Sequence, residues 1–189
     1  MRGCAKGDQV VASVDWVMIV LRFFHIVGGA LWVGSAFLFV AVIGPSAAEV
    51  GPSAGPLLQV AVKKRKVATL ITIFATSTVL AGWLMWLKNL RDYDWKVSTW
   101  VFHSNGFGLA ITLGAILASI AWYEGYFHVG KGVEELVDLG AELAAAEGPP
   151  APEKLSRMQS IQESLKKHGQ VDIVLLLITV ALMATAQYW

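Results

Sequence analysis

The segment FFHIVGGALWVGSAFLFVAVI, residues 23–43, decides the fold class, because His25 is the one ionisable side chain among its 21 residues. A helix of about 20 residues spans the roughly 30 Å hydrocarbon core of a bilayer. Three more apolar segments of comparable length follow along the chain. Since a helix satisfies its own backbone hydrogen bonds in lipid, these four segments predict an all-α integral membrane protein, an up-down four-helix bundle.

The expected spans lie near residues 16–43, 67–89, 100–126 and 170–189 of a single domain that covers 1–189. Hydrophobic residues make up 56% of the chain and charged residues only 15%, against about 25% charged residues in soluble domains. Tryptophan and tyrosine gather near the predicted span ends, where amphipathic rings settle in a bilayer. They are Trp16, Trp86, Trp95, Trp100, Trp122, Tyr123, Tyr126, Tyr188 and Trp189. Composition and ring placement therefore both indicate a lipid bilayer as the surroundings.

The connections between the spans carry signals of their own. Residues 44–55 hold repeated Gly-Pro turn signals and are expected to form a loop. The longer connection, residues 130–168, has helix-like pieces at 133–147 and 153–167, separated by a proline-rich break. We expect these pieces to lie along the membrane, to cap the bundle or to form a solvated connector.

Four crossings place both termini on one side of the membrane, called side A here, and residues 130–168 on the other, side B. Side B carries nine of the 15 lysines and arginines, including the cluster at residues 63–66 beside the second span. The positive-inside rule then predicts that side B faces the cytoplasm of a bacterium and that both termini are periplasmic, in the inner membrane. A net charge of +1 does not provide the concentrated basic surface of a nucleic-acid-binding protein, so no nucleic acid is expected.

Ionisable residues at membrane depth are costly, so His25 and His103 are candidates for function. Both are expected just inside side A, on the first and third spans, which sit diagonally in an up-down bundle. Two facing imidazoles at one depth are a way to hold haem b through axial nitrogens. Gly28, Gly29 and Gly106 would leave room for a porphyrin, although the same glycines also permit close helix packing without a cofactor.

Other side chains could complete such a site. Arg22 shares the helix face of His25, and it is either a partner for haem propionates or an arginine that reaches the interface. Trp32 lies seven residues after His25. Met183 or Met85 could supply the second axial ligand, although methionine in an apolar helix mostly fills the core.

A second pair of histidines, His128 and His168, lies at the side B ends of the third and fourth spans. This pair could bind a metal ion or a second haem, or it could simply be solvated at the interface. Asp172, near the start of the fourth span, could cap that helix or pair with a lysine. The sequence leaves these alternatives open.

Several runs of residues resemble copper resistance protein D-like membrane proteins. The first span carries Arg22–Gly34 with Phe39 and Gly44-Pro45, in which a histidine is followed seven residues later by Trp-x-Gly. Further resemblances lie in the other spans, at Ala81–Leu84, at Asn105–Gly108 with Gly114, and at Asp172–Tyr188. The likeness covers most of the chain outside the N-terminal dozen residues and the connection 130–168.

The wider set of such proteins includes the HemJ-type protoporphyrinogen oxidase and the membrane part of cytochrome-linked urate oxidases. Resemblance to this set implies a b-type haem with His25 as a ligand. The chain departs from the HemJ type at Phe39-Val40-Ala41-Val42, where that type carries Tyr-x-x-Arg. It also lacks the methionine- and histidine-rich patches expected of copper-handling proteins.

The leading hypothesis is a small b-type haem-binding cytochrome, or haem-carrying subunit, that moves electrons near the outer face of the inner membrane. At 20.4 kDa it would serve other subunits of a redox complex or a periplasmic electron carrier rather than act as a stand-alone enzyme. The first alternative is a cofactor-free structural or assembly subunit of a membrane complex. The second is HemJ-like porphyrinogen oxidation or copper handling.

Overall fold

The computed structural model describes residues 14–146, 148–149 and 151–188. Within these ranges every regular element is a helix, and four helical segments are long and apolar enough to cross a membrane. The predicted all-α four-helix membrane bundle is therefore confirmed. Trp189, at the end of the predicted fourth span, and residues 1–13 of the predicted domain lie outside the described residues.

Asp15 caps the N-terminus of helix α1 (Trp16–Leu38), because its side chain accepts a hydrogen bond from the N–H of Met18 at 3.0 Å. A carboxylate here satisfies one of the N–H groups that the first helical turn leaves without a partner. The chain then stays helical through a π-helical turn (Phe39–Ile43) into α2 (Gly44–Val50).

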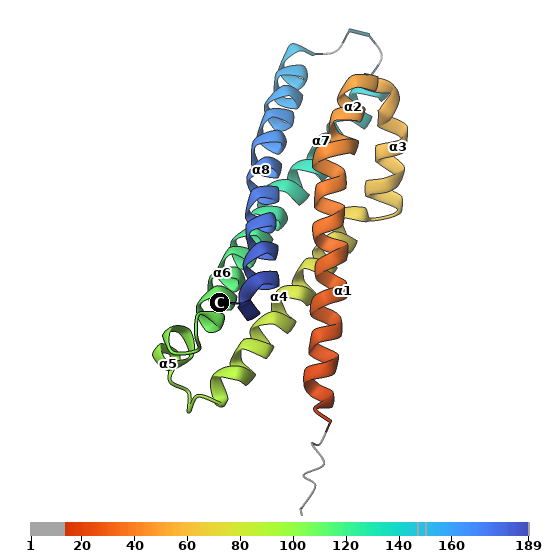
Figure 1. Cartoon of the computed structure of the whole chain (residues 1–189). Helices are drawn as coiled ribbons and strands as arrows, with labels where there is room; N and C mark the ends of the chain where they lie inside the picture. The colour runs from red at the N-terminus through yellow and green to blue at the C-terminus, as the bar shows by residue number, and fades with distance from the viewer. Residues whose placement is uncertain (1–13, 147, 150, 189) are drawn as a thin grey trace, which may run out of the picture.

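The expected loop at residues 44–55 is helical instead, so that prediction was wrong. Helix α2 is followed by a 3-10 turn (Gly51–Ala54) and by α3 (Gly55–Gln59). Proline occupies the first turn of each of these short helices, where its missing N–H costs nothing. The chain reverses near Gly51, whose φ of 67° lies in the region that favours glycine, and α3 runs back beside α2 (Figure 1).

Helix α4 (Val67–Arg91) is reached through a second π-helical turn (Val60–Lys64). Lys66 ends that segment with a φ of 53°, a left-handed conformation that breaks the helical path before α4 starts. The basic cluster of the sequence therefore lies at a bend, immediately before the second span.

The third span contains a break. A short helix, α5 (Val97–Phe102), occupies the residues where the span was expected to start, and α6 (Phe107–Glu124) begins only after a turn. Ser104 helps to start α6, because its Oγ accepts a hydrogen bond from the N–H of Gly108 at 2.7 Å. Gly106 completes the turn with a φ of 84°. Regular helix is thereby interrupted between residues 102 and 107.

Helix α6 continues through a π-helical segment (Gly125–Gly130) into α7 (Lys131–Ala145), and α8 (Pro152–Thr185) returns as one helix. A 3-10 turn (Ala186–Tyr188) ends the described chain. The connection 130–168 is thus helical over most of its length, and its second piece is continuous with the fourth span.

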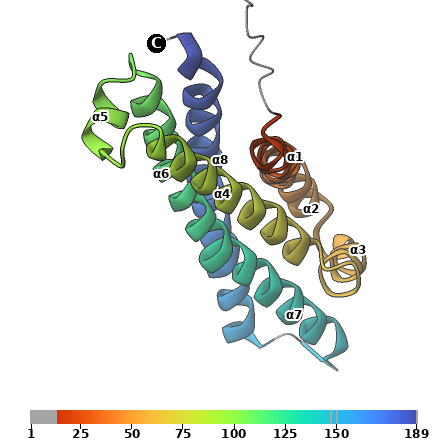
Figure 2. The same cartoon turned by 90° about the horizontal axis from the view of Figure 1, so that it is seen from below.

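The four long helices alternate in direction, with the start of α1, the end of α8 and α5 toward one end, and α2, α3 and α7 toward the other (Figure 1). These ends correspond to side A and side B. Helix α1 packs chiefly against α4, and α6 against α8, while α4 also contacts α6. Figure 2 shows α4 between α1 and α6, so α1 and α6 occupy opposite corners of the bundle.

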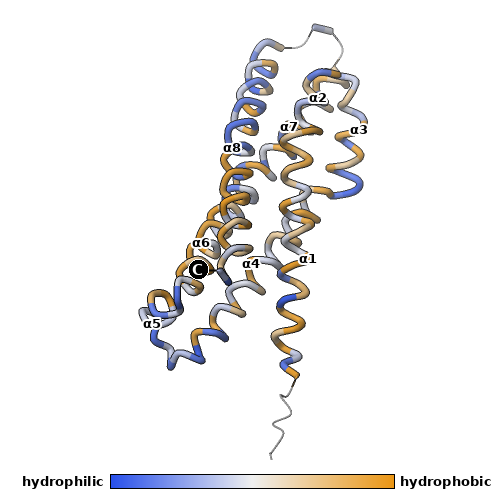
Figure 3. The backbone as a smooth tube through the Cα atoms, in the orientation of Figure 1, coloured by the Kyte–Doolittle hydropathy of each residue, from blue (hydrophilic) through white to orange (hydrophobic). Residues whose placement is uncertain are grey.

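Hydrophobic residues occupy the central part of the long helices, and hydrophilic residues mark the first half of α8 (Figure 3). Each long helix gives one residue to a buried cluster: Trp32, Ala75, Ala121 and Leu176. Outside this cluster many large apolar side chains, such as Phe23, are exposed. A soluble protein rarely exposes large apolar patches, whereas lipid-facing positions are apolar, so a bilayer accounts for this surface.

Candidate functional site

His25 lies half-buried between α1 and α4. Its Nδ1 donates a hydrogen bond to the carbonyl oxygen of Thr78 at 2.8 Å, and Thr78 Oγ1 donates to the carbonyl oxygen of His25 at 3.4 Å. The ring rests against Gly82, where an added Cβ would come within 3.0 Å of His25 Cε1. Since a carbonyl oxygen only accepts, Nδ1 supplies the proton of this hydrogen bond, and Nε2 takes no part in it.

His103 is exposed at the end of α5, in the break before α6. In Figures 1 and 2, α5 and α1 lie on opposite sides of the molecule, with α4 and α8 between them. The structure therefore does not bring His25 and His103 together. Two axial ligands must reach one iron from opposite faces of the porphyrin, so a haem held between these two residues does not fit this arrangement.

The glycines of α1 face a neighbouring helix. A Cβ on Gly28 would lie 2.5 Å from Thr78 Oγ1 and 2.7 Å from Ser77 Oγ, and a Cβ on Gly29 would lie 3.4 Å from Thr78 Cγ2. Glycine at these positions lets α1 and α4 approach each other closely. These contacts favour the packing alternative for the two glycines.

The other residues of the expected haem site take part in separate contacts. Trp32 is buried in the central cluster, and Gly106 forms the turn before α6. The side chain of Met183 lies against Gly114 of α6, where an added Cβ would be 3.0 Å from Met183 Cγ. Arg22 is exposed on α1. Trp32, Gly106 and Met183 therefore serve packing or turn formation.

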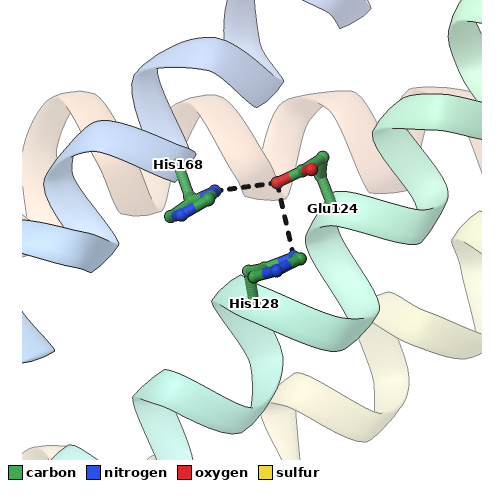
Figure 4. A group of neighbouring side chains, drawn as sticks. All are labelled: Glu124, His128 and His168. Carbon is green, nitrogen blue, oxygen red and sulfur yellow. Dashed lines mark hydrogen bonds and ion pairs between the residues drawn. The ribbon is translucent and has the colours of Figure 1, made fainter.

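A different group of titratable side chains comes together toward side B: Glu124, His128 and His168 (Figure 4). Glu124 Oε2 lies 2.8 Å from His168 Nδ1 and 3.4 Å from His128 Nδ1. The two imidazole rings stack nearly parallel, with an interplanar angle of 8° and centroids 4.6 Å apart. One potential ligand atom from each of the three residues lies within 4.8 Å of the others.

The local helix geometry builds this group, called the Glu-His-His cluster below. Glu124 and His128 are four residues apart, so they project from neighbouring turns of one helix face. The π-helical segment Gly125–Gly130 starts between them, and such wide turns are uncommon and recur at functional sites. His168 approaches from α8, which packs along α6, so two helices supply the three groups.

Two histidines and one carboxylate form a donor set that binds divalent transition metals. Sets of this composition hold catalytic zinc and non-haem Fe(II). With bonds of about 2.0 Å, two donors on a tetrahedral ion lie about 3.3 Å apart. The three potential ligand atoms lie within 4.8 Å of one another, so they would need to approach by up to about 1.5 Å. Glu124 and His168 are half-buried and His128 is exposed, which gives an ion access from the outside.

Asp172 follows His168 by one helical turn on α8 and is buried, with 6% of its surface exposed. Its Oδ1 has no hydrogen-bond partner, and no lysine or arginine pairs with it in the described part of the chain. The expected role as a cap or as a lysine's partner was therefore wrong, since the residue lies inside α8. It lines a cavity of about 100 Å³ between the long helices.

Sequence reasoning named His128 and His168 but missed Glu124 and the burial of Asp172. The signal was present in the spacing, because Glu124-x-x-x-His128 and His168-x-x-x-Asp172 each place an acid and a histidine on one helix face. Spacing alone does not show that these two faces meet.

The fold and the cluster define a class, a multi-pass four-helix membrane protein with a Glu-His-His group toward one end of its bundle. No family model, curated protein or solved structure matches the chain. The likeness to copper resistance protein D-like proteins therefore stays a prediction from the sequence.

Proposed function

We propose that the protein binds a divalent transition-metal ion, such as Zn²⁺ or Fe²⁺, through Glu124, His128 and His168. The observation that carries this proposal is the meeting of three donors, from two helices, within 4.8 Å of one another. Three protein ligands leave a coordination position open for water or an exchanging ligand, unlike the closed four-ligand sites that only hold a fold together. The function supported best is thus reversible metal binding by a small membrane protein.

The contacts between Glu124 and the two histidines would organise such a site. Glu124 Oε2 lies within reach of Nδ1 on both histidines. The ion would take the place of the proton between Glu124 and the histidines, with Glu124 as the third ligand, so metal binding would release protons.

Isothermal calorimetry of the full-length protein in a maltoside detergent, titrated with Zn²⁺, tests this proposal. His168→Ala should weaken binding by at least about tenfold, since even residues that only support a metal ligand are worth 10–100-fold. His103→Ala is the matched control, because His103 is an exposed histidine outside the cluster. The Zn²⁺ affinity of this variant should equal that of the wild type. No Zn²⁺ binding, or equal weakening in the two variants, would contradict the proposal. The same titration of the wild type and the two variants with Cu²⁺ tests copper handling.

We further propose that side B, the end of the bundle that holds the Glu-His-His cluster, faces the cytoplasm of a bacterium. The protein then spans the inner membrane with both termini in the periplasm. Support comes from the excess of lysine and arginine on side B, above all the cluster at residues 63–66. A reporter enzyme that is active only in the periplasm should be active when fused to the C-terminus. An inactive fusion, with an active cytoplasmic reporter at the same position, would reverse the orientation.

A second candidate function, a haem b-carrying subunit that moves electrons, rests on the orientation of His25. Its Nδ1 is held by the carbonyl of Thr78, which is how a ligating histidine commonly presents Nε2 to a metal. His103 would not be the second ligand. In this role the protein would exchange electrons with other subunits or with a periplasmic carrier.

An absorption spectrum separates this candidate from the others. The dithionite-reduced protein, produced with ample haem, should show the sharp α-band of a b-type haem. The band should be lost in His25→Ala and kept in His103→Ala. A colourless protein would favour the cofactor-free structural alternative, and turnover of protoporphyrinogen would favour porphyrin oxidation.

A further inference from the structure

Next to the Glu-His-His cluster lies the cavity of about 100 Å³ that Asp172 lines. The four long helices and their extensions form its wall, and the largest side chains in it are aromatic: Trp32, Phe39, Trp122 and Tyr126. An apolar cavity of roughly 150 Å³ admits a molecule of the size of benzene. This cavity therefore has room for about four or five non-hydrogen atoms.

The carboxylate in this wall lacks a counter-charge among the residues that the structure describes. Asp172 is 6% exposed, and within residues 14–146, 148–149 and 151–188 its Oδ1 has no hydrogen-bond partner. The nearby Glu124 and His168 bond to each other, and the hydroxyl of Thr72 donates to the carbonyl of Ala68. Burial of an unpaired carboxylate is costly. A cation that enters the cavity would remove this cost.

We propose that the cavity binds a small organic ammonium ion, whose nitrogen pairs with Asp172 Oδ1 and whose alkyl groups contact Trp32, Trp122 and Tyr126. Aromatic rings attract alkylammonium ions through their negative faces, and aromatic cages recognise such ions in other proteins. A metal ion is a poorer occupant, because the wall is mostly apolar and hard cations require several oxygen donors. This inference is independent of metal binding at the Glu-His-His cluster.

Trimethylammonium and tert-butanol form a matched pair of probes, since they have similar shapes and only the first is charged. In isothermal calorimetry with the full-length protein in a maltoside detergent, trimethylammonium should bind. Its affinity should exceed that of tert-butanol by at least about tenfold, because a charge-assisted contact to the carboxylate is lost with the neutral probe. Equal affinities for the two probes, or no binding of either, would overturn the proposal.

Two variants test the residues. Asp172→Asn keeps the side-chain shape and should weaken trimethylammonium binding by at least about tenfold. Ala36→Leu fills part of the cavity with a larger side chain and leaves the carboxylate unchanged. It should abolish the binding of trimethylammonium. His168→Ala should leave the ammonium affinity unchanged while it weakens Zn²⁺ binding, so the two proposals can fail separately. Wild-type ammonium affinity in a folded Asp172→Asn protein would overturn the assignment.

An ammonium group could come from a free amine or from the headgroup of a choline lipid. Nanodiscs of phosphatidylcholine and of phosphatidylglycerol distinguish these sources. A weaker apparent affinity for trimethylammonium in phosphatidylcholine would support the site and identify the lipid as a competitor, whereas equal affinities would support the site with a free amine as its ligand. Loss of binding in both lipids would overturn the proposal for the protein in a bilayer.

Discussion

The two ends of the bundle are built differently. Toward side A, where α4, α5 and α6 meet, a buried cluster fills the interior: Trp86, Leu90, Trp100 and Val101. Toward side B, histidines share a carboxylate, and Asp172 lines a cavity with an oxygen that has no partner in the described ranges of the chain. Apolar packing stabilises a fold, whereas cavities and groups of ionisable side chains concentrate at functional sites. The comparison therefore assigns stability to side A and binding to side B.

The tryptophans of side A illustrate the first half of this contrast. Trp83 Nε1 donates to Ser119 Oγ at 3.0 Å, and Trp86 Nε1 donates to Thr112 Oγ1 at 2.9 Å. Trp100 differs, because it is 2% exposed and its Nε1 has no hydrogen-bond partner among the described residues. Its ring therefore contributes through packing alone, and packing is the property that a truncation would remove.

The largest expected effect is the loss of Trp100, whose ring lies against Tyr93 and Phe107 at centroid distances of 5.2 and 5.8 Å. Trp100→Ala should lower the free energy of unfolding by about 3–5 kcal/mol, the usual cost of removing a buried tryptophan. Trp95, 61% exposed on the same side, is the matched control, and Trp95→Ala should change this free energy by less than about 0.5 kcal/mol. Denaturation in detergent, followed by circular dichroism, measures both. Similar losses of unfolding free energy in Trp100→Ala and Trp95→Ala would contradict the view that the buried cluster of side A stabilises the fold.

Metal binding should stabilise the protein from the opposite end. A ligand at about 100 times its dissociation constant adds about 2.7 kcal/mol to the free energy of unfolding. We expect Zn²⁺ to produce this gain in the wild type and in Trp100→Ala, but not in His168→Ala, in the same denaturation experiment. A gain that persists in His168→Ala would assign the ion to other side chains. A gain that disappears in Trp100→Ala would show that the two ends are coupled.

Between the two ends, the contact of α1 with α4 depends on Gly28. A Cβ there would lie 2.5 Å from Thr78 Oγ1 and 3.0 Å from the carbonyl oxygen of Phe74, so Gly28→Ala must displace the Thr78 hydroxyl and crowd the backbone of α4. We expect a loss of about 1–3 kcal/mol in the free energy of unfolding, typical of overpacking. Gly34→Ala is the control on the same helix, because no atom from elsewhere in the described part of the chain lies within 4 Å of its added Cβ. Unchanged stability together with loss of a haem spectrum in Gly28→Ala would instead give the glycine a role in cofactor binding.

The fold was largely predictable because the thickness of a bilayer dictates segment length. The four apolar segments therefore predicted four spanning helices, and the proline-rich break in residues 130–168 predicted two helical pieces. The loop prediction at residues 44–55 is wrong because a Gly-Pro pair is compatible with a turn and with the start of a helix. In the structure these prolines begin short helices, a position that tolerates proline as well as a turn does.

The site was harder to predict, because it depends on how helices are offset against one another. The prediction placed His103 one turn inside a continuous third span, whereas regular helix stops at Phe102 and resumes at Phe107, so His103 lies in the break. His128 and His168 meet because α6 and α8 pack in one particular register. The periodicity of a single helix reports its own apolar face and carries no information on that register.

The smallest expected effect lies on the surface of side A, where Lys88 pairs with Asp15. The hydrogen bond from Lys88, followed by that from the N–H of Met18, holds the pKa of Asp15 below its ordinary value of 3.8. A carboxyl with a lowered folded-state pKa stabilises the fold above its unfolded pKa, and this contribution is lost as the pH falls through the folded pKa.

Asp15→Asn keeps a capping oxygen but removes the charge, so its free energy of unfolding should fall less than that of the wild type between about pH 5 and pH 3. The difference should shrink in about 1 M salt, which screens exposed pairs. Equal pH dependence in both proteins would mean that the buried aromatic cluster stabilises side A without help from this pair.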